Sequence, residues 1–188
     1  NSRQMALAWI MYADDNHGRP APNVDSDTAG KSATVPSWVA GWLTFTSSFD
    51  NTNAAMLVNH DAYPYGAYLV PYIKTPATFK CPAAHSKTLI YGTYSDRVRS
   101  ISKNNFLGAP SDSTTAADPW TDPKGTSKYA PYQKIDSILS PTLTFVFLDE
   151  REDSINDGTF FTSVDSPGSL IDIPASYHGG AGGFSFAD

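Results

Sequence analysis

The first sixteen residues carry apolar side chains at helical spacing. Gly18 and Pro20 end this pattern, because glycine caps the C-terminal ends of helices and proline cannot continue one. Ile10 and neighbouring alanines widen the apolar face beyond half of the helix circumference, so we predict a helix that needs cover on several sides. The residues that define the face recur three or four positions apart: Met5, Ala8, Trp9 and Tyr12.

The other apolar runs are short and typical of strands. The strongest is T-L-T-F-V-F-L at residues 142–148, which is almost wholly apolar or β-branched and is expected at the centre of a sheet. An acidic segment and an Asp-Gly pair separate it from a second run at residues 159–162, which predicts a β-hairpin over residues 142–164. Further strands or extended segments are predicted at residues 37–45, 97–102 and 184–186, and short helices at residues 53–59 and 66–73.

The order of these elements predicts one α+β domain over residues 1–188. A single helix followed by antiparallel strands buries its apolar face when the helix packs on one face of an antiparallel sheet. Residues 107–132 form a long irregular loop dense in Pro, Ser, Thr, Asp and Gly, and loops of that length are usually functional.

Composition narrows the classes of partner. The chain has 13 Lys and Arg against 19 Asp and Glu, a net charge of -6, so no basic stripe is present to bind nucleic acid. No run in this sequence approaches the ~18 apolar residues of a membrane-spanning helix. Cys81 is the one cysteine, so an internal disulfide is excluded, and a small buried hydrophobic role is its simplest interpretation.

An acidic run between residues 149 and 157 is the first candidate site. Crowded carboxylates repel one another, and a Ca²⁺ ion relieves that repulsion through oxygen ligands. The spacing fails the EF-hand test, and a solvated acidic loop in which Asp153 makes turn hydrogen bonds is the simpler interpretation. The candidate calcium ligands are Asp149, Glu150, Asp153 and Asp157.

The C-terminal segment begins with His178 and is rich in glycine. His-Gly-Gly is found in the oxyanion hole of some hydrolases, but the nucleophile elbow that such enzymes need is missing, so catalysis is not expected. We predict a structural role in which His178 hydrogen-bonds Asp188 or the acidic run. The remaining histidines are scattered without the spacing of zinc ligands.

Aromatic residues in and after the long loop are candidates for ligand binding. Trp120, Tyr129 and Tyr132 are predicted to be exposed platforms that stack sugar rings or contact a partner subunit.

Five segments together resemble a known family. The chain carries M-Y-A-D-D-N-H-G-R at residues 11–19, F-K-C-P-A at 79–83, R-V-R-S-I-S-K-N at 97–104, F-L-D-E-R-E-D-S-I-N-D-G at 147–158 and H-G-G-A-G-G-F-S-F-A-D at 178–188. The last resembles the H-x(9)-D-G box of prepilin-processing-associated proteins, which are type II secretion pseudopilin-like proteins of planctomycete and verrucomicrobial bacteria. The final glycine of that box is not in this sequence, which ends at Asp188.

The resemblance implies a pilin-like fold and a structural function. Residues 1–17 would be the C-terminal half of a pilin helix whose apolar first half, missing here, anchors in the inner membrane. The expected partners are other pilin or pseudopilin subunits, and the expected location is the cell envelope, with the head domain periplasmic or extracellular. We therefore expect a non-enzymatic pseudopilin-like subunit of a type II secretion or type IV pilus-related assembly.

Two other functions fit parts of the sequence. A glycan- or substrate-binding module displayed on the same scaffold would use the loop aromatics. A carboxylate-based hydrolase would use a pair such as Asp149 and Asp157, but it also needs a cleft, which a small sheet-on-helix domain seldom provides.

Overall fold

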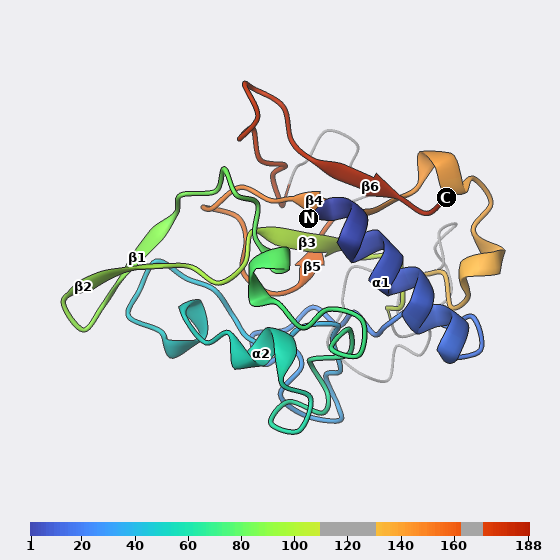
Figure 1. The fold of residues 1–188 in the computed structure, drawn as a ribbon, viewed down its shortest axis with the longest axis horizontal. Coiled ribbons are helices and arrows are strands. Elements are labelled where there is room, and N and C mark those ends of the chain that lie inside the picture. The colour runs from blue at the N-terminus through green and yellow to red at the C-terminus, as the bar shows by residue number, and fades with distance from the viewer. Residues whose placement is uncertain (110–130, 163–170) are drawn as a thin grey trace.

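The computed structural model describes residues 1–109, 131–162 and 171–188 as an α+β fold with an N-terminal helix and two sheets (Figure 1). This confirms the α+β class predicted from the sequence. The helices are α1 (Ser2–Asp15) and α2 (Ala55–Val58), with 3-10 turns at Phe49–Asn51, Pro76–Phe79, Ile135–Ser137 and Pro141–Leu143. The strands are β1 (Lys87–Ile90), β2 (Thr93–Asp96), β3 (Ile101–Asn104), β4 (Phe145–Asp149), β5 (Thr159–Phe160) and β6 (Phe184–Phe186).

The larger sheet has the strand order β5-β3-β4-β6. β4 lies inside it and pairs antiparallel with both β3 and β6, which confirms the predicted central position of this strand. β1 and β2 form a separate antiparallel hairpin that projects from the rest of the fold (Figure 1). We call this hairpin the arm.

The predicted hairpin over residues 142–164 is wrong. β5 pairs with β3 and runs parallel to it, so β3 lies between β4 and β5 and the larger sheet is mixed. The acidic segment that connects β4 with β5 contains a turn, in which the Ser154 and Ile155 amides donate to the Arg151 carbonyl. An Asp-Gly pair marked a turn but did not fix which strand the chain would join.

Helix α1 lies along one face of the larger sheet, against β4 and β6 (Figure 1). Met5 and Trp9 are fully buried on that side. The helix ends as predicted: the Gly18 amide donates to the Ala13 carbonyl at 2.7 Å, with Gly18 in the left-handed region at φ +76°. The residues predicted for the apolar face are buried or half-buried, whereas Leu7 and Met11, which lie outside that face, are each 51% exposed.

Residues 37–45, predicted as a strand or an extended segment, form no strand. Their backbone amides bond to several separate segments: Ala40 to the Met56 carbonyl, Gly41 to that of Ala29 and Leu43 to that of Asn156. Of the aromatic residues in this segment, Trp38 is buried in the core, whereas Phe45 is 54% exposed.

Trp38 is the centre of that core. Its ring lies 5.9 Å from the Phe79 ring in a stacked arrangement and 5.0 Å from the Phe147 ring in an edge contact. The indole N–H donates to the Gly158 carbonyl at 2.8 Å, so the polar atom of this fully buried side chain is satisfied.

All four residues of strand β3 are buried, polar side chains included. Lys103 is the clearest example: its ammonium donates to the Ala21 carbonyl at 2.5 Å and to the Pro22 carbonyl at 3.3 Å. Residues 66–73, predicted as a helix, form only turns.

Candidate functional site

Three side chains that are distant in sequence converge at the C-terminal end of β4. Cys81 and Asp149 are buried and His178 is exposed. One donor atom from each lies within 4.8 Å of the other two, and among the described residues this is the single group of three or more such side chains with that property. We call these residues the Cys-Asp-His cluster.

Cys81 follows the 3-10 turn Pro76–Phe79 and is held by a tight turn of its own. Its backbone amide donates to the Ser100 hydroxyl at 2.8 Å, and its carbonyl accepts from the Ala84 amide at 2.9 Å. Burial raises the pKa of the Cys81 thiol, and the backbone amides of Ala83 and Ala84, which hydrogen-bond to the sulfur, act in the opposite direction.

Asp149 is the last residue of β4, and its Oδ2 faces the glycine-rich C-terminal segment. That oxygen accepts a hydrogen bond from the Gly183 amide at 3.1 Å. A Cβ at residue 183 would lie only 2.7 Å from it, so a side chain at this position would push the carboxylate away. Glycine at position 183 therefore leaves room for this close approach.

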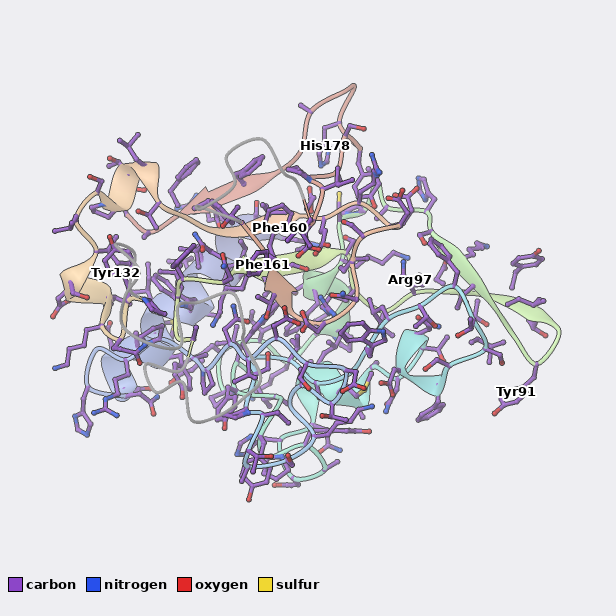
Figure 2. The ribbon with its side chains drawn as sticks, turned by 180° about the vertical axis from the view of Figure 1, so that it is seen from behind. Tyr91, Arg97, Tyr132, Phe160, Phe161 and His178 are labelled. Atoms are coloured by element: carbon purple, nitrogen blue, oxygen red, sulfur yellow. The ribbon has the colours of Figure 1, made fainter. Side chains whose placement is uncertain are left out.

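His178 starts a tight turn before β6 (Figure 2). Its amide donates to the Ala181 carbonyl at 3.0 Å, and Gly179 and Gly180 adopt positive φ angles of +64° and +94°. This turn places the His178 Nε2 atom 3.3 Å from the Asp149 Oδ2 atom and 3.3 Å from the Cys81 Sγ atom.

The use of one nitrogen for both contacts limits the chemistry of the cluster. In a nucleophile–His–Asp triad, one imidazole nitrogen faces the nucleophile and the other faces the carboxylate. Here Nε2 faces both Cys81 and Asp149, so a proton relay of that kind is not arranged. Sulfur, imidazole and carboxylate donors facing one another are the ligand types of a zinc site.

The four candidate calcium ligands do not share a site. Asp149 belongs to the Cys-Asp-His cluster, and Asp153 is exposed and pairs with Arg151 at 2.5 Å. Asp157 accepts hydrogen bonds from the backbone amides of Ser26 and Thr159, at 2.8 and 2.7 Å. The hydrolase pair Asp149 and Asp157 is likewise separated into different surroundings.

Glu150, the remaining member of that set, is fully buried. One of its oxygens accepts from the Ser154 hydroxyl at 2.8 Å. Burial, followed by the nearby Asp172, raises the pKa of Glu150 to about 8. Burial and the neighbouring Asp25 raise the pKa of Asp157 well above its usual range. Carboxyl groups that favour the protonated state are poor calcium ligands.

Two arginines from the segment before β3 explain why the acidic segment folds inward. Arg97 donates to the backbone carbonyls of Glu152 and Ile155, at 2.6 and 3.0 Å. Arg99 donates to the carbonyl of Asn156 at 3.1 Å. These carbonyl oxygens, which a calcium loop would direct to the metal, are already occupied by guanidinium groups.

The two ends of the C-terminal box are not joined. His178 contacts the predicted acidic run through Asp149, which confirms one of the two partners predicted for it. Asp188 is exposed, and no hydrogen bond or ion pair connects it to His178 in the described part of the chain. Of the two predicted partners, His178 therefore contacts the acidic run, and a structural role for Asp188 stays a prediction.

The structure describes one of the three aromatic residues that were predicted to bind a ligand. Trp120 and Tyr129 lie outside the described residues. Tyr132 is half-buried and packs against the hydrophobic core, and its amide donates to the Phe106 carbonyl at 2.7 Å. Its prediction as an exposed platform is wrong, because the bridge between Leu107 and Tyr132 draws it inward.

Sequence reasoning did not connect Cys81 with His178. The sequence did contain three potential metal ligands. They are Cys81 before a proline, His178 before two glycines and Asp149 at the end of the strongest strand. Nothing in the spacing of these residues shows that the chain brings them together.

Among the described residues, no helix combines the length and apolar character required to cross a bilayer. Comparisons with protein-family models, with curated proteins and with solved structures found no match.

Proposed function

We propose that this chain is the head domain of a non-catalytic, pseudopilin-like structural subunit of a type II secretion or type IV pilus-related assembly. The observation that supports the proposal is the position of α1, which packs one side on β4 and β6 and leaves the other side open. An N-terminal helix packed on a sheet is the arrangement that the family resemblance implies.

The open side of α1 supplies a contact surface. Leu7 and Met11 lie four positions apart, one helical turn, and are each 51% exposed. They border a shallow depression of about 310 Å³ that Tyr72 and Thr75 also line. We call Leu7 and Met11 the helix strip. In the proposed assembly another pilin-type subunit covers this strip, which removes its apolar surface from water.

The proposal places the head domain in the cell envelope. It requires an apolar helical segment of about 20 residues before α1 in the full-length polypeptide, since that length crosses a bilayer. This segment would anchor the subunit in the inner membrane before assembly and would lie in the core of the assembled polymer. The head domain would then project from that core.

The full-length protein in its own cells provides the test. The proposal predicts that it is recovered with the membrane fraction and in complexes larger than a monomer. The double variant Leu7→Ser and Met11→Ser should lose the complexes and keep the membrane association, because the strip contacts subunits and the upstream segment contacts lipid.

Leu89→Ser is the matched control, since Leu89 is an exposed apolar residue of the arm, 44% exposed. It should leave the complexes intact. A full-length protein that stays monomeric and outside the membrane fraction would contradict the proposal, and so would complexes that persist in the helix-strip variant.

A second function, binding of a glycan by a module on this scaffold, is favoured by one separate observation. Tyr91 and Tyr94 on the arm are 89% and 72% exposed, and Tyr91 lies at its tip (Figure 2). Aromatic rings in such positions stack on sugars. Retention of the wild-type chain on a polysaccharide column, lost in the double variant Tyr91→Ala and Tyr94→Ala, would support this function.

A further inference from the structure

We propose that Cys81, Asp149 and His178 bind one divalent transition-metal ion of the zinc class. The site lies at the end of β4, and nothing in the family resemblance or in the proposed subunit function requires it. The metal-site proposal rests on the geometry of the Cys-Asp-His cluster. It is tested separately from the pseudopilin proposal.

Two of the three distances between the ligand atoms are close to those of a tetrahedral metal site, and the third, from Cys81 to Asp149, is within 4.8 Å. Zinc bonds of about 2.3 Å to sulfur and about 2.0–2.2 Å to nitrogen and oxygen place tetrahedral ligands roughly 3.4–3.6 Å apart. The His178 Nε2 atom lies 3.3 Å from Cys81 Sγ and 3.3 Å from Asp149 Oδ2. Small side-chain adjustments would bring the three atoms to coordination distance.

One proton on His178 does not satisfy both contacts of its Nε2 atom. A proton on Nε2 can point squarely at the sulfur or at the carboxylate, but not at both, and 3.3 Å is long for a bond to oxygen. Without that proton, the nitrogen lone pair would face the carboxylate of Asp149. A cation between the three atoms satisfies all of them at once.

Neighbouring groups support the ligands as they do in known metal sites. The Gly183 amide donates to Asp149, and the backbone amide of Cys81 donates to the Ser100 hydroxyl. Outer hydrogen bonds of this kind orient the ligands of metal sites. The side chain of His178 is 49% exposed, which gives the ion a route from solvent.

The donor types select the metal. Thiolate and imidazole ligands favour zinc and similar transition metals over calcium and magnesium, which prefer oxygen. Three protein ligands leave one position for a water molecule. Bound metal would join the turn after the Pro76–Phe79 helix, the end of β4 and the turn before β6, and would thereby stabilise the C-terminal segment.

Titration of the reduced whole chain with Co²⁺ alone is the test, because tetrahedral cobalt with a thiolate ligand has a distinct absorption spectrum. We expect one Co²⁺ per chain, a thiolate-to-cobalt charge-transfer band, displacement of Co²⁺ by Zn²⁺ and no displacement by Ca²⁺. The absence of that spectrum in the wild-type chain would overturn the proposal.

Variants assign the ligands. Cys81→Ser, Asp149→Asn and His178→Ala should each weaken Co²⁺ binding more than about 100-fold, since loss of an outer partner alone costs 10–100-fold. His178 is exposed, so His178→Ala keeps the test valid if the buried variants fail to fold. His85→Ala is the matched control, because His85 is exposed and borders a surface depression together with Cys81. Binding that survives His178→Ala, or that depends equally on His85, would overturn the proposal.

Discussion

Strand β4 pairs antiparallel with its neighbours, and the two strands of the arm pair antiparallel with each other. The two regions differ in what surrounds them. β4 has a partner strand on each edge and α1 against one face, and four of its five residues are buried. Within residues 1–109, 131–162 and 171–188, β1 and β2 pair only with each other, and Leu89, Tyr91 and Tyr94 of the arm are exposed.

The difference shows where the fold obtains its stability. An isolated two-stranded hairpin is marginal in water, whereas a strand inside a covered sheet buries apolar surface on both sides. The arm is tied to the rest of the chain through Thr88, a buried residue whose hydroxyl donates to the Thr46 carbonyl at 3.2 Å. Exposed aromatic residues of the arm therefore contribute little to folding and are free to make contacts with other molecules.

The largest expected effect comes from the core beside β4. Phe147→Ala should lower the free energy of unfolding by about 3–5 kcal/mol, because it removes a fully buried ring in contact with Trp38. Urea denaturation followed by circular dichroism measures this change. A cost below about 1 kcal/mol would mean that β4 is not the stable centre that its burial indicates.

The next effect concerns the close approach at the end of β4. Gly183→Ala should cost about 1–3 kcal/mol, because the new methyl group would meet the Asp149 carboxylate. In an Asp149→Ala background the same substitution should cost less, since the clash is removed. Equal costs in both backgrounds would show that the clash is not the cause.

An effect of similar size depends on pH. Burial raises the pKa of Asp172 from 3.8 to about 6, so between these values the folded state binds more protons than the unfolded state. Stability contributed by this group is complete below about pH 4 and is lost as the pH rises through about 6. Asp172→Asn should reduce the fall in stability between pH 4 and pH 7 by about 1–3 kcal/mol.

Thermal unfolding across that pH range measures the change. Asp96→Asn, on the arm, is the control and should leave the pH dependence as it is, because the Asp96 side chain is 63% exposed. An Asp172→Asn curve parallel to that of the wild-type chain would contradict the prediction.

The smallest effect is expected on the arm. Tyr91→Ser with Tyr94→Ser should change the free energy of unfolding by less than about 0.5 kcal/mol, because both side chains are exposed. Denaturation under the conditions used for Phe147→Ala gives a direct comparison. A cost as large as that of the core variant would remove the contrast between the two regions.

Local patterns in the sequence predicted the features that depend on a few neighbouring residues. The end of α1 followed from Gly18, and the inner position of β4 followed from its apolar run. Such features depend on a few neighbouring residues, and the structure confirms them.

Features that depend on distant segments were not predictable in this way. Residues 37–45 have aromatic residues typical of a strand, yet their amides bond to several separate segments. The acidic run looked solvated because its partners, Arg97 and Arg99, lie about fifty positions away. The Cys-Asp-His cluster combines three segments that no spacing rule connects.

Position-specific photo-crosslinking in the full-length protein is the most direct test of the proposed subunit function. A photoreactive amino acid at Met11, on the helix strip, should crosslink to further copies of the chain or to other pilin-type subunits in intact cells. The same group at Tyr91, on the arm, should not give these products. Subunit crosslinks from Tyr91 together with none from Met11 would contradict the proposal.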